Sequence, residues 1–288
     1  MSTTDRSYIL TLTCPDRTGI VAAVTGFLAE RDGFITELSH YADPISHRSF
    51  IRAEFYAGSP KLPERQALFT QFTSVAEDFS MDFQLRPADE KARVVVMVSK
   101  FGHCLNNLLH DWKSGNLPID IVAVVSNHDD MRSFVEWHQI PYHHLPVTPD
   151  TKAQQEADLR ALIDDLDIDL VVLARYMQIL SPALCQHLAW RAINIHHSFL
   201  PSFKGARPYH QAHARGVKLI GATAHYVTTD LDEGPIIEQT TERVDHTQTP
   251  QDLVRIGRDI ESVVLNRAVR WHGERRVLPN GSKTVVFR

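Results

Sequence analysis

The sequence predicts an α/β protein of two domains, the first with strands and helices in the order βαββαβ and the second with a mostly parallel, doubly wound sheet. Two patterns carry this prediction. The first 86 residues contain short alternating strand runs around two helical runs, and from residue 93 onward continuous apolar runs alternate with helical segments. Residues 87–92 are charged and aperiodic and form the expected linker, so we predict domains over 1–86 and 93–288.

The first domain is expected to have the ferredoxin-like order of elements. Its predicted strands are 7–13, 34–41, 49–56 and 81–85, and its predicted helices are 20–31 and 62–79. Pro63 is expected in the first turn of the second helix, where proline is tolerated.

The second domain is expected to be Rossmann-like. Its β-branched runs read as strands buried on both faces, at 93–99, 119–126 and 169–174. Helices are predicted between and after them, at 104–113, 129–138, 151–165 and 181–190. Two further strands, a long helix and a hairpin around Asn280-Gly281 complete the chain, at 192–196, 218–227, 249–271 and 277–287. In such sheets ligands bind at the carboxyl ends of the strands.

Composition excludes several function classes. Thirty basic and 35 acidic residues give a formal net charge of −5, which offers no electrostatic case for binding nucleic acid or an anionic membrane. No apolar run approaches the ~18 residues of a membrane span, and the N-terminus lacks the apolar core of a signal peptide. Cys14, Cys104 and Cys185 form no C-x-x-C pair. A cytoplasmic protein with reduced thiols is expected.

The strand at 192–196 places two polar side chains on one face. Asn194 and His196 alternate with apolar residues, and an acidic, turn-rich loop, 228–235, follows the next strand. If this loop folds back over the strand end, Asp230, Asp232 or Glu233 would join the pair. An amide, an imidazole and a carboxylate suit attack on a carbonyl, because they can stabilise an oxyanion and accept a proton. The alternative is a structural strand end beside a solvated loop.

Four motifs of this region carry a resemblance to a known family. They are Asn194-Ile195-His196, Ser198-Phe199-Leu200-Pro201, His225-Tyr226-Val227 and Asp232-Glu233-Gly234-Pro235-Ile236-Ile237. In order and interval they resemble the N-I-H, S-L-L-P, H-F-V and D-x-G-x-I-I motifs of the folate-dependent formyltransferases.

This resemblance implies catalytic roles for Asn194, His196 and Asp232. It further implies a set of folate-binding positions: Met177, Gln178, Leu180, Gly205, His225, Val227, Thr228 and Leu231. Gln178 departs from the arginine that is frequent in the family. For Met177, Ile179 and Leu180 the alternative is plain core packing.

The turn after the first strand of the second domain departs from part of that family. Phosphate-binding turns need several glycines, and residues 99–106 contain only Gly102. A phosphorylated amine acceptor is therefore not expected. The resemblance then implies hydrolysis of 10-formyltetrahydrofolate to formate and tetrahydrofolate, which would supply purine biosynthesis and balance the one-carbon pool. No cofactor and no metal are expected, because His196 and His197 should face opposite ways on a strand.

The first domain resembles the ACT domain, through D-R-x-G-I-V at its first turn. That resemblance implies a homo-oligomer, a dimer or tetramer, and an amino-acid effector such as glycine or methionine near Asp16, Gly19 and Gly33. The alternative is structural, with Asp16 capping the first helix and Gly19 allowing close packing.

Three rival functions remain open at this point. The chain could transfer the formyl group to an amine acceptor, it could be a catalytically silent amino-acid sensor that binds folate, or it could be a metal-dependent hydrolase. Formate release without an acceptor, calorimetry with amino acids and sensitivity to a chelator would separate them.

Overall fold

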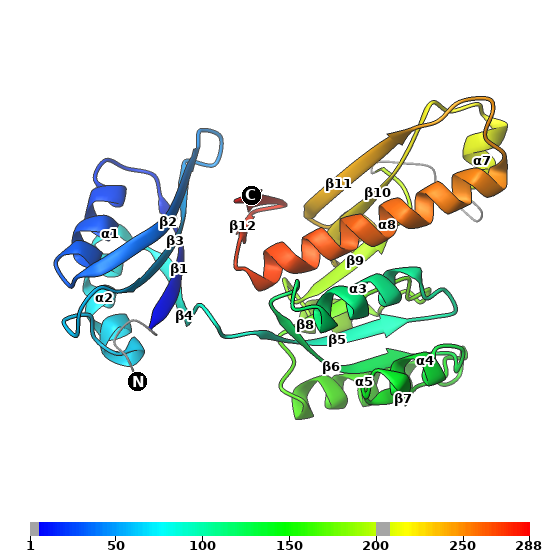
Figure 1. Ribbon diagram of the computed structural model, residues 1–288, viewed down its shortest axis with the longest axis horizontal. Helices are drawn as coiled ribbons and strands as arrows, with labels where there is room; N and C mark the ends of the chain where they lie inside the picture. Colours follow the sequence, from blue (N-terminus) through cyan, green and yellow to red (C-terminus); the bar gives the residue numbers. More distant parts are fainter. Residues whose placement is uncertain (1–5, 200–207) are drawn as a thin grey trace. The chain divides into compact units, whose positions relative to one another are not determined.

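The computed structural model describes residues 6–199 and 208–288 and divides the chain into two compact units. One unit runs up to Glu90 and includes Glu274–Arg288, and the other is Lys91–Gly273. The chain therefore passes from the first unit into the second and then returns (Figure 1). The sequence had placed residues 93–288 together, whereas the contacts assign Glu274–Arg288 to the first unit.

The first unit has the predicted ferredoxin-like order. Its elements are β1 (Ser7–Pro15), α1 (Ile20–Ala29), β2 (Gly33–Asp43), β3 (Arg48–Ala57), α2 (Arg65–Phe79) and β4 (Asp82–Pro87). They form an antiparallel sheet in the order β2-β3-β1-β4. Ile51, Ala53 and Phe55 of β3 join the core with residues of both helices. The helix α2 begins at Arg65, so Pro63 precedes it and does not lie in its first turn.

The other face of β3 contacts the C-terminal hairpin, β12 (Val277–Asn280) and β13 (Lys283–Val286). Phe50 packs with Leu278, Val285 and Phe287, because alternate residues of a strand face opposite sides. The buried Arg52 donates to the backbone oxygen of Glu274 at 3.0 Å. The hairpin is therefore part of the first unit through both apolar and polar contacts.

The second unit is built on a seven-stranded sheet in the order β11-β10-β9-β8-β5-β6-β7. The strands are β5 (Ala92–Val98), β6 (Ile119–Ser126), β7 (Tyr142–His144), β8 (Leu170–Leu173), β9 (Ala192–His196), β10 (Leu219–Tyr226) and β11 (Ile236–Arg243). The pairs from β7 to β9 are parallel, whereas β10 is antiparallel to both of its neighbours. The mostly parallel sheet is confirmed. The strands β7 and β11 were not predicted.

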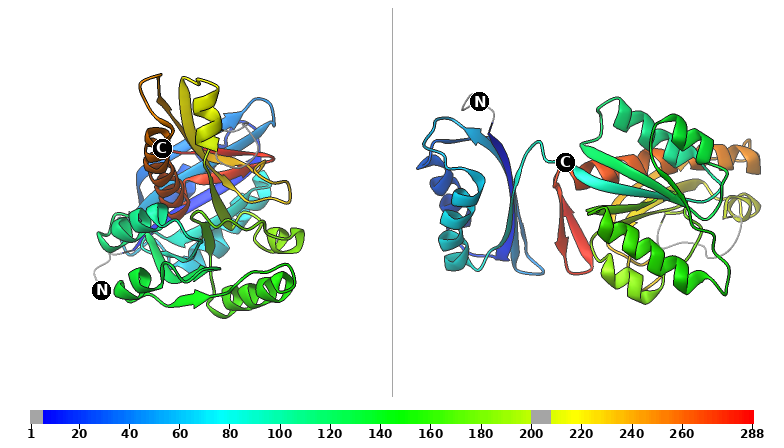
Figure 2. Two further views of the ribbon diagram at one scale, coloured as in Figure 1. Left: turned by 90° about the vertical axis from the view of Figure 1, so that its right-hand side faces the viewer. Right: turned by 90° about the horizontal axis from the view of Figure 1, so that it is seen from below.

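Helices cover both faces of this sheet (Figure 2). They are α3 (His103–Lys113), α4 (Arg132–Trp137), α5 (Lys152–Asp165), α6 (Pro182–His187), α7 (Pro208–Ala214) and α8 (Pro250–Gly273). The helices α3 and α8 lie side by side (Figure 1), and α8 packs along β9, β10 and β11. Apolar residues of α5 and α6 pack with Val95, Met97 and Val171 of the strands. Within residues 6–199 and 208–288, no helix combines the length and apolar character that crossing a membrane requires.

Candidate active site

Asn194 and His196 lie near the carboxyl end of β9, on the face opposite to the buried Ile193 and Ile195. In the antiparallel register between β9 and β10, Asn194 stands directly opposite His225. Their side chains meet, with 3.2 Å between Asn194 Nδ2 and His225 Nε2. The alternation of β9 thus places Asn194 and His196 on the same face of the sheet. The neighbouring strand β10 brings His225 to the same place.

The loop between β10 and β11 turns sharply, and Gly234 makes that turn possible. Tyr226 N donates to the oxygen of Pro235 at 2.9 Å, which closes the loop at its base. A Cβ atom at Gly234 would lie 1.7 Å from the backbone oxygen of Tyr226, a distance that no side chain can accept. Asp232 has a φ of 59°, a left-handed conformation that aspartate tolerates better than bulkier residues. The backbone conformation of this loop therefore explains why the D-x-G motif has aspartate at 232 and glycine at 234.

Of the three candidate carboxylates in this loop, Asp232 is the one that contacts the histidines. Asp232 Oδ1 lies 3.2 Å from His196 Nδ1 and 3.7 Å from His225 Nε2. The hydrogen bond from His196 is the largest influence on Asp232 and holds its pKa well below its usual range, although partial burial opposes this. Asp232 is therefore ionised throughout the neutral pH range.

The hydrogen bonds of His225 indicate how Asn194 is oriented. His225 Nδ1 lies 2.9 Å from the backbone oxygen of Tyr226, so Nδ1 carries the hydrogen. In neutral His225 the other ring nitrogen, Nε2, is then an acceptor for the Asn194 amide. An amide nitrogen has two N–H groups, and the second remains available to a substrate oxygen.

A cavity of about 210 Å³ opens beside these side chains. The predicted folate-binding positions Met177, Gln178, Leu180, His225, Val227, Thr228 and Leu231 all line it, together with Asn194, His196 and Asp232. Gly205 lies outside the described residues. Met177, Ile179 and Leu231 are 55%, 61% and 58% exposed, so they are not core residues, whereas Leu180 is buried in the core. Exposed apolar side chains around a cavity fit an aromatic ligand that would cover them.

The wall formed by residues 175–180 is held by Ser99, the residue after β5. Its hydroxyl donates to Asn127 Oδ1 at 2.6 Å and accepts from the Met177 N–H at 3.0 Å. Tyr176 lines the cavity and is also part of the core, where Gln155 donates to its hydroxyl at 3.2 Å, and burial raises the pKa of Tyr176 to about 12. The wall is therefore fixed by one contact from the residue after β5 and one from α5.

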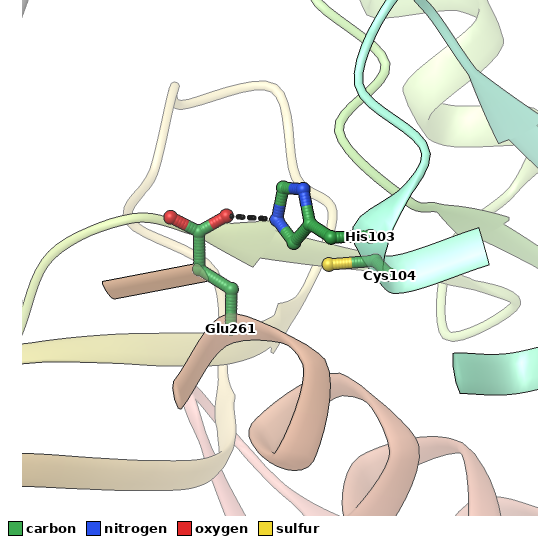
Figure 3. Close-up of side chains that lie close together, drawn as sticks. All are labelled: His103, Cys104 and Glu261. Carbon is green, nitrogen blue, oxygen red and sulfur yellow. Dashed lines mark hydrogen bonds and ion pairs between the residues drawn. The ribbon is translucent and has the colours of Figure 1, made fainter. Parts of the chain in front are cut away.

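A second polar cluster lies beside the cavity, around the buried Glu261 of α8. Glu261 accepts from Tyr209 Oη at 2.7 Å, its other carboxylate oxygen lies 2.8 Å from His103 Nε2, and that same oxygen lies 3.4 Å from Arg175 Nε. Figure 3 shows His103 at the start of α3 pointing toward Glu261. Burial raises the pKa of Glu261, but the His103 hydrogen bond, the charge of Arg175 and the Tyr209 hydrogen bond outweigh it and hold the pKa low. We call these four residues the Glu261 network.

Sequence reasoning missed this network. Glu261 was the available signal, because it lies three and four positions before Val264 and Leu265 on the buried stripe of α8, where a charged residue needs a partner. Nothing local to the sequence identifies Arg175, His103 or Tyr209 as that partner.

His197 also differs from the prediction. Its ring was expected to face away from that of His196, yet both rings line the cavity and their centroids are 4.7 Å apart. The reason is that β9 ends at His196, so the alternation of a strand no longer applies to residue 197. Burial, and then the charge of Arg175, lower the pKa of His197 to about 4. His197 is therefore neutral at pH 7.

The side chains of His103, Cys104 and Glu261 offer ligand atoms within 4.8 Å of one another, which raises the question of a metal (Figure 3). Both oxygens of Glu261 already engage His103, Tyr209 and Arg175. Burial raises the pKa of the Cys104 thiol, so the thiolate that a metal needs is disfavoured. The donor set is thus used within the protein and fits a hydrogen-bonded ion network better than a cation site.

The predicted effector residues of the first unit have local structural roles. Gly19 is the N-cap of α1 with a φ of 95°, and no side chain caps that helix. Asp16 accepts from Ser49 Oγ at 2.6 Å, so the expectation that Asp16 caps α1 is wrong. A Cβ atom at Gly19 would make only an ordinary contact, at 3.9 Å, so the positive φ and not close packing explains this glycine. At Gly33 a Cβ atom would lie 3.1 Å from the oxygen of Leu28.

Comparison with known proteins agrees with this geometry. Residues 92–269 match the family model described as formyl transferase. The chain belongs to the formyl transferase family. A family relative named formyltetrahydrofolate deformylase, from Corynebacterium sp. (strain P-1), is 55% identical over 281 residues, which is 98% of each chain. The crystal structure of a formyltetrahydrofolate deformylase from Burkholderia mallei ATCC 23344 matches with a TM-score of 0.94 and 52% identity, over 98% of this chain and 100% of that one.

Formyltransferases of known structure match a smaller share of this chain. The phosphoribosylglycinamide formyltransferase of Coxiella burnetii superposes with a TM-score of 0.64 and 31% identity, covering 68% of this chain and 94% of its own. The likeness to this formyltransferase therefore covers about two thirds of the chain, whereas the likeness over nearly the whole chain is to proteins named deformylases.

Proposed function

We propose that this protein hydrolyses 10-formyltetrahydrofolate to formate and tetrahydrofolate. The observation that carries the proposal is the convergence of Asn194, His196 and Asp232 in a cavity that the exposed apolar side chains of Met177, Ile179 and Leu231 also line. The names of the relatives that match nearly the whole chain support the same reaction. Formate release of this kind would supply purine biosynthesis and balance the one-carbon pool.

The geometry favours a route in which Asp232 acts through His196. Asp232 accepts the hydrogen of His196 Nδ1, which leaves His196 Nε2 free to take a proton from the attacking water. The pKa of Asp232 lies well below its usual range, so this carboxylate is a weak base and a good partner for an imidazolium. As the water attacks, the negative charge on the formyl oxygen is stabilised by the second N–H of Asn194.

The test is formate release from 10-formyltetrahydrofolate with no acceptor present, for the wild type and for Asp232→Asn and His196→Ala. Each variant removes a group that acts in the transition state, so kcat is expected to fall about 100- to 1000-fold. Glu233→Gln is the matched control for the loop, because Glu233 is exposed and does not line the cavity. His210→Ala, on the exposed side of α7, is the matched histidine control. Normal turnover in either site variant would remove that residue from the mechanism.

For the first unit we propose a regulatory role, with glycine or methionine as effector and a homo-oligomer, a dimer or tetramer, as the working state. The support is its ferredoxin-like sheet and its resemblance to the ACT domain. Formate release measured with and without each amino acid tests the effector, and light scattering tests the oligomer. We also propose a cytoplasmic location, because all three cysteines are free and buried, as suits a reducing compartment.

A further inference from the structure

The Glu261 network occupies the place where an open α/β sheet usually binds a ligand. After β5 the chain adds β6 and β7 on one side, and then crosses to add β8 and β9 on the other side. The order of strands therefore reverses between β5 and β8. In sheets of this kind, the crevice outside the carboxyl ends of the two strands at such a reversal binds ligands.

Side chains of the protein itself fill this crevice. His103 follows β5 and Arg175 follows β8, so both lie at the carboxyl ends of the two strands. Glu261 comes from α8 and Tyr209 from α7, and the four side chains are joined by contacts of 2.7 to 3.4 Å. Only 1% of the Glu261 side chain and 13% of the Arg175 side chain are exposed. A second substrate would have to displace these groups to enter.

The network reaches the reaction cavity through Arg175, and His197 lies between the network and His196. Arg175 and His197 both line that cavity. The ring of His197 lies 4.7 Å from that of His196 and 6.4 Å from that of Tyr209. His197 therefore connects the reacting groups to the network, and whatever occupied the crevice would stand next to the formyl carbon.

We propose that the Glu261 network determines the specificity for water by closing the subsite in which an amine acceptor would bind. This inference rests on the proposed hydrolysis. The formyltransferase of Coxiella burnetii, which shares this sheet, is named for a second organic substrate, phosphoribosylglycinamide. In this chain Arg175 balances the charge of Glu261 inside the crevice, so the buried carboxylate has a counter-charge within the protein itself.

The two outcomes differ in one bond. In hydrolysis the oxygen of water bonds to the formyl carbon, the bond from that carbon to the folate nitrogen breaks, and the folate nitrogen takes a proton while formate leaves. With an amine, the amine nitrogen forms the new bond, the same carbon–nitrogen bond breaks, and the amine gives its proton to the folate nitrogen. The second route yields an N-formyl amide and needs room for the amine.

The experiment measures, for each protein, how much of the formyl group is transferred to water and how much to the amine. Wild type and variants are given 10-formyltetrahydrofolate with an excess of glycinamide, a small uncharged primary amine, and N-formylglycinamide and formate are quantified by mass spectrometry. The variant Arg175→Gly opens the crevice without backbone cost, because Arg175 has a φ of 65° that glycine adopts readily. The double variant Arg175→Gly with Glu261→Gln avoids leaving a buried carboxylate without its counter-charge.

We expect no detectable N-formylglycinamide from the wild type, and in the opened variants a ratio of N-formylglycinamide to formate at least about tenfold above the detection limit. The ratio is independent of the overall rate, so a merely structural role of Arg175 would not change it. His103→Ala removes one ring while keeping the pair of Arg175 and Glu261, and a smaller rise is expected. Arg132→Ala is the matched control, because Arg132 also pairs with two carboxylates, but at the surface.

Two results would overturn the proposal. One is a folded opened variant that releases only formate. The other needs no variant at all and is a wild type that forms N-formylglycinamide in proportion to the added amine. A wild type that releases no formate from 10-formyltetrahydrofolate would instead contradict the proposed hydrolysis, so the two failures are distinguishable.

Discussion

Two pairs of a histidine and a carboxylate lie near one another at the carboxyl ends of the same sheet, and they differ in what surrounds them. The distance from His196 Nδ1 to Asp232 Oδ1 is 3.2 Å, and that from His103 Nε2 to Glu261 Oε2 is 2.8 Å. The Asp232 side chain is 27% exposed and lines a cavity, whereas the Glu261 side chain is 1% exposed and is held by Tyr209 and Arg175 as well.

The comparison shows that pairing alone does not identify a reactive group. In the Glu261 network each carboxylate oxygen already contacts a protein group, so this carboxylate is engaged within the protein. At Asp232 the carboxylate orients an imidazole that lines a cavity, and the second nitrogen of this imidazole has no protein partner among residues 6–199 and 208–288. Unused hydrogen-bonding capacity next to an open volume, and not the residue types, separates reaction chemistry from structure.

The largest expected effect comes from moving Asp232 without removing it. In Gly234→Ala the added Cβ would lie 1.7 Å from the oxygen of Tyr226, so the loop must shift and carry Asp232 away from His196. A misplacement of about 1 Å can cost 100-fold, so kcat should fall about 100-fold or more. Gly26→Ala, in α1 with nothing within 4 Å of its Cβ, is the control and should leave turnover unchanged. Normal kcat in Gly234→Ala would show that the loop position is unimportant.

Substitution in the buried pair of His103 and Glu261 should instead change the stability of the folded protein. Glu261→Gln leaves the buried guanidinium of Arg175 without its counter-charge, so the free energy of unfolding should fall by about 3–5 kcal/mol. Asp232→Asn, at a partly exposed site, should lower it by no more than about 1 kcal/mol. Urea denaturation of the two variants measures both values. A larger loss of stability in Asp232→Asn than in Glu261→Gln would contradict the distinction between the two pairs.

His197 lies between the two pairs and should make stability depend on pH. Its pKa is lowered to about 4 in the folded chain, below about 6.5 for an unperturbed histidine. The unfolded chain therefore binds this proton first, so the stabilisation is complete above pH 6.5 and is lost as the pH falls toward 4, by about 2–3 kcal/mol. His197→Asn should lose correspondingly less stability over this interval in thermal melts. If the stability of the wild type and of His197→Asn changed with pH in the same way, His197 would not be the group responsible for this pH dependence.

The smallest effect is expected at a third pair of this kind, on the surface. His187 Nε2 lies 3.0 Å from Asp164 Oδ1, and half of the Asp164 side chain is exposed. Solvent screens such a pair, so Asp164→Asn should change the free energy of unfolding by less than about 1 kcal/mol and leave formate release unchanged. A larger loss of stability would show that solvent exposure does not determine how much each pair contributes to the free energy of unfolding.

Local patterns predicted much of this structure. Alternation placed Asn194 and His196 on one face, and the Asn280-Gly281 pair predicted the terminal hairpin. The start of α8 likewise depends on local chemistry, with Asp252 N donating to Thr249 Oγ1 at 3.2 Å. Each of these features depends on residues that are close in the sequence. Strand alternation and the conformational preferences of turn residues are sufficient to predict them.

What could not be predicted depends on distant partners. The polar strand β11 lacks the apolar alternation of a strand and is formed by its pairing with β10. Arg175 and Glu261 are 86 positions apart, and no local pattern joins them. The hairpin was predicted, but not the sheet that it covers, because that depends on Phe50 and Arg52 of a strand more than 200 residues earlier.

The return of the chain to its first unit limits how the protein can be divided. A fragment that stops at Glu90 would lack β12 and β13, and would leave Phe50 in water and the Arg52 guanidinium without the Glu274 carbonyl. Module shuffling or truncation at the linker would therefore give a destabilised, aggregation-prone piece. A circular permutant that fuses the hairpin to the first ninety residues is the more suitable form for isolating that unit.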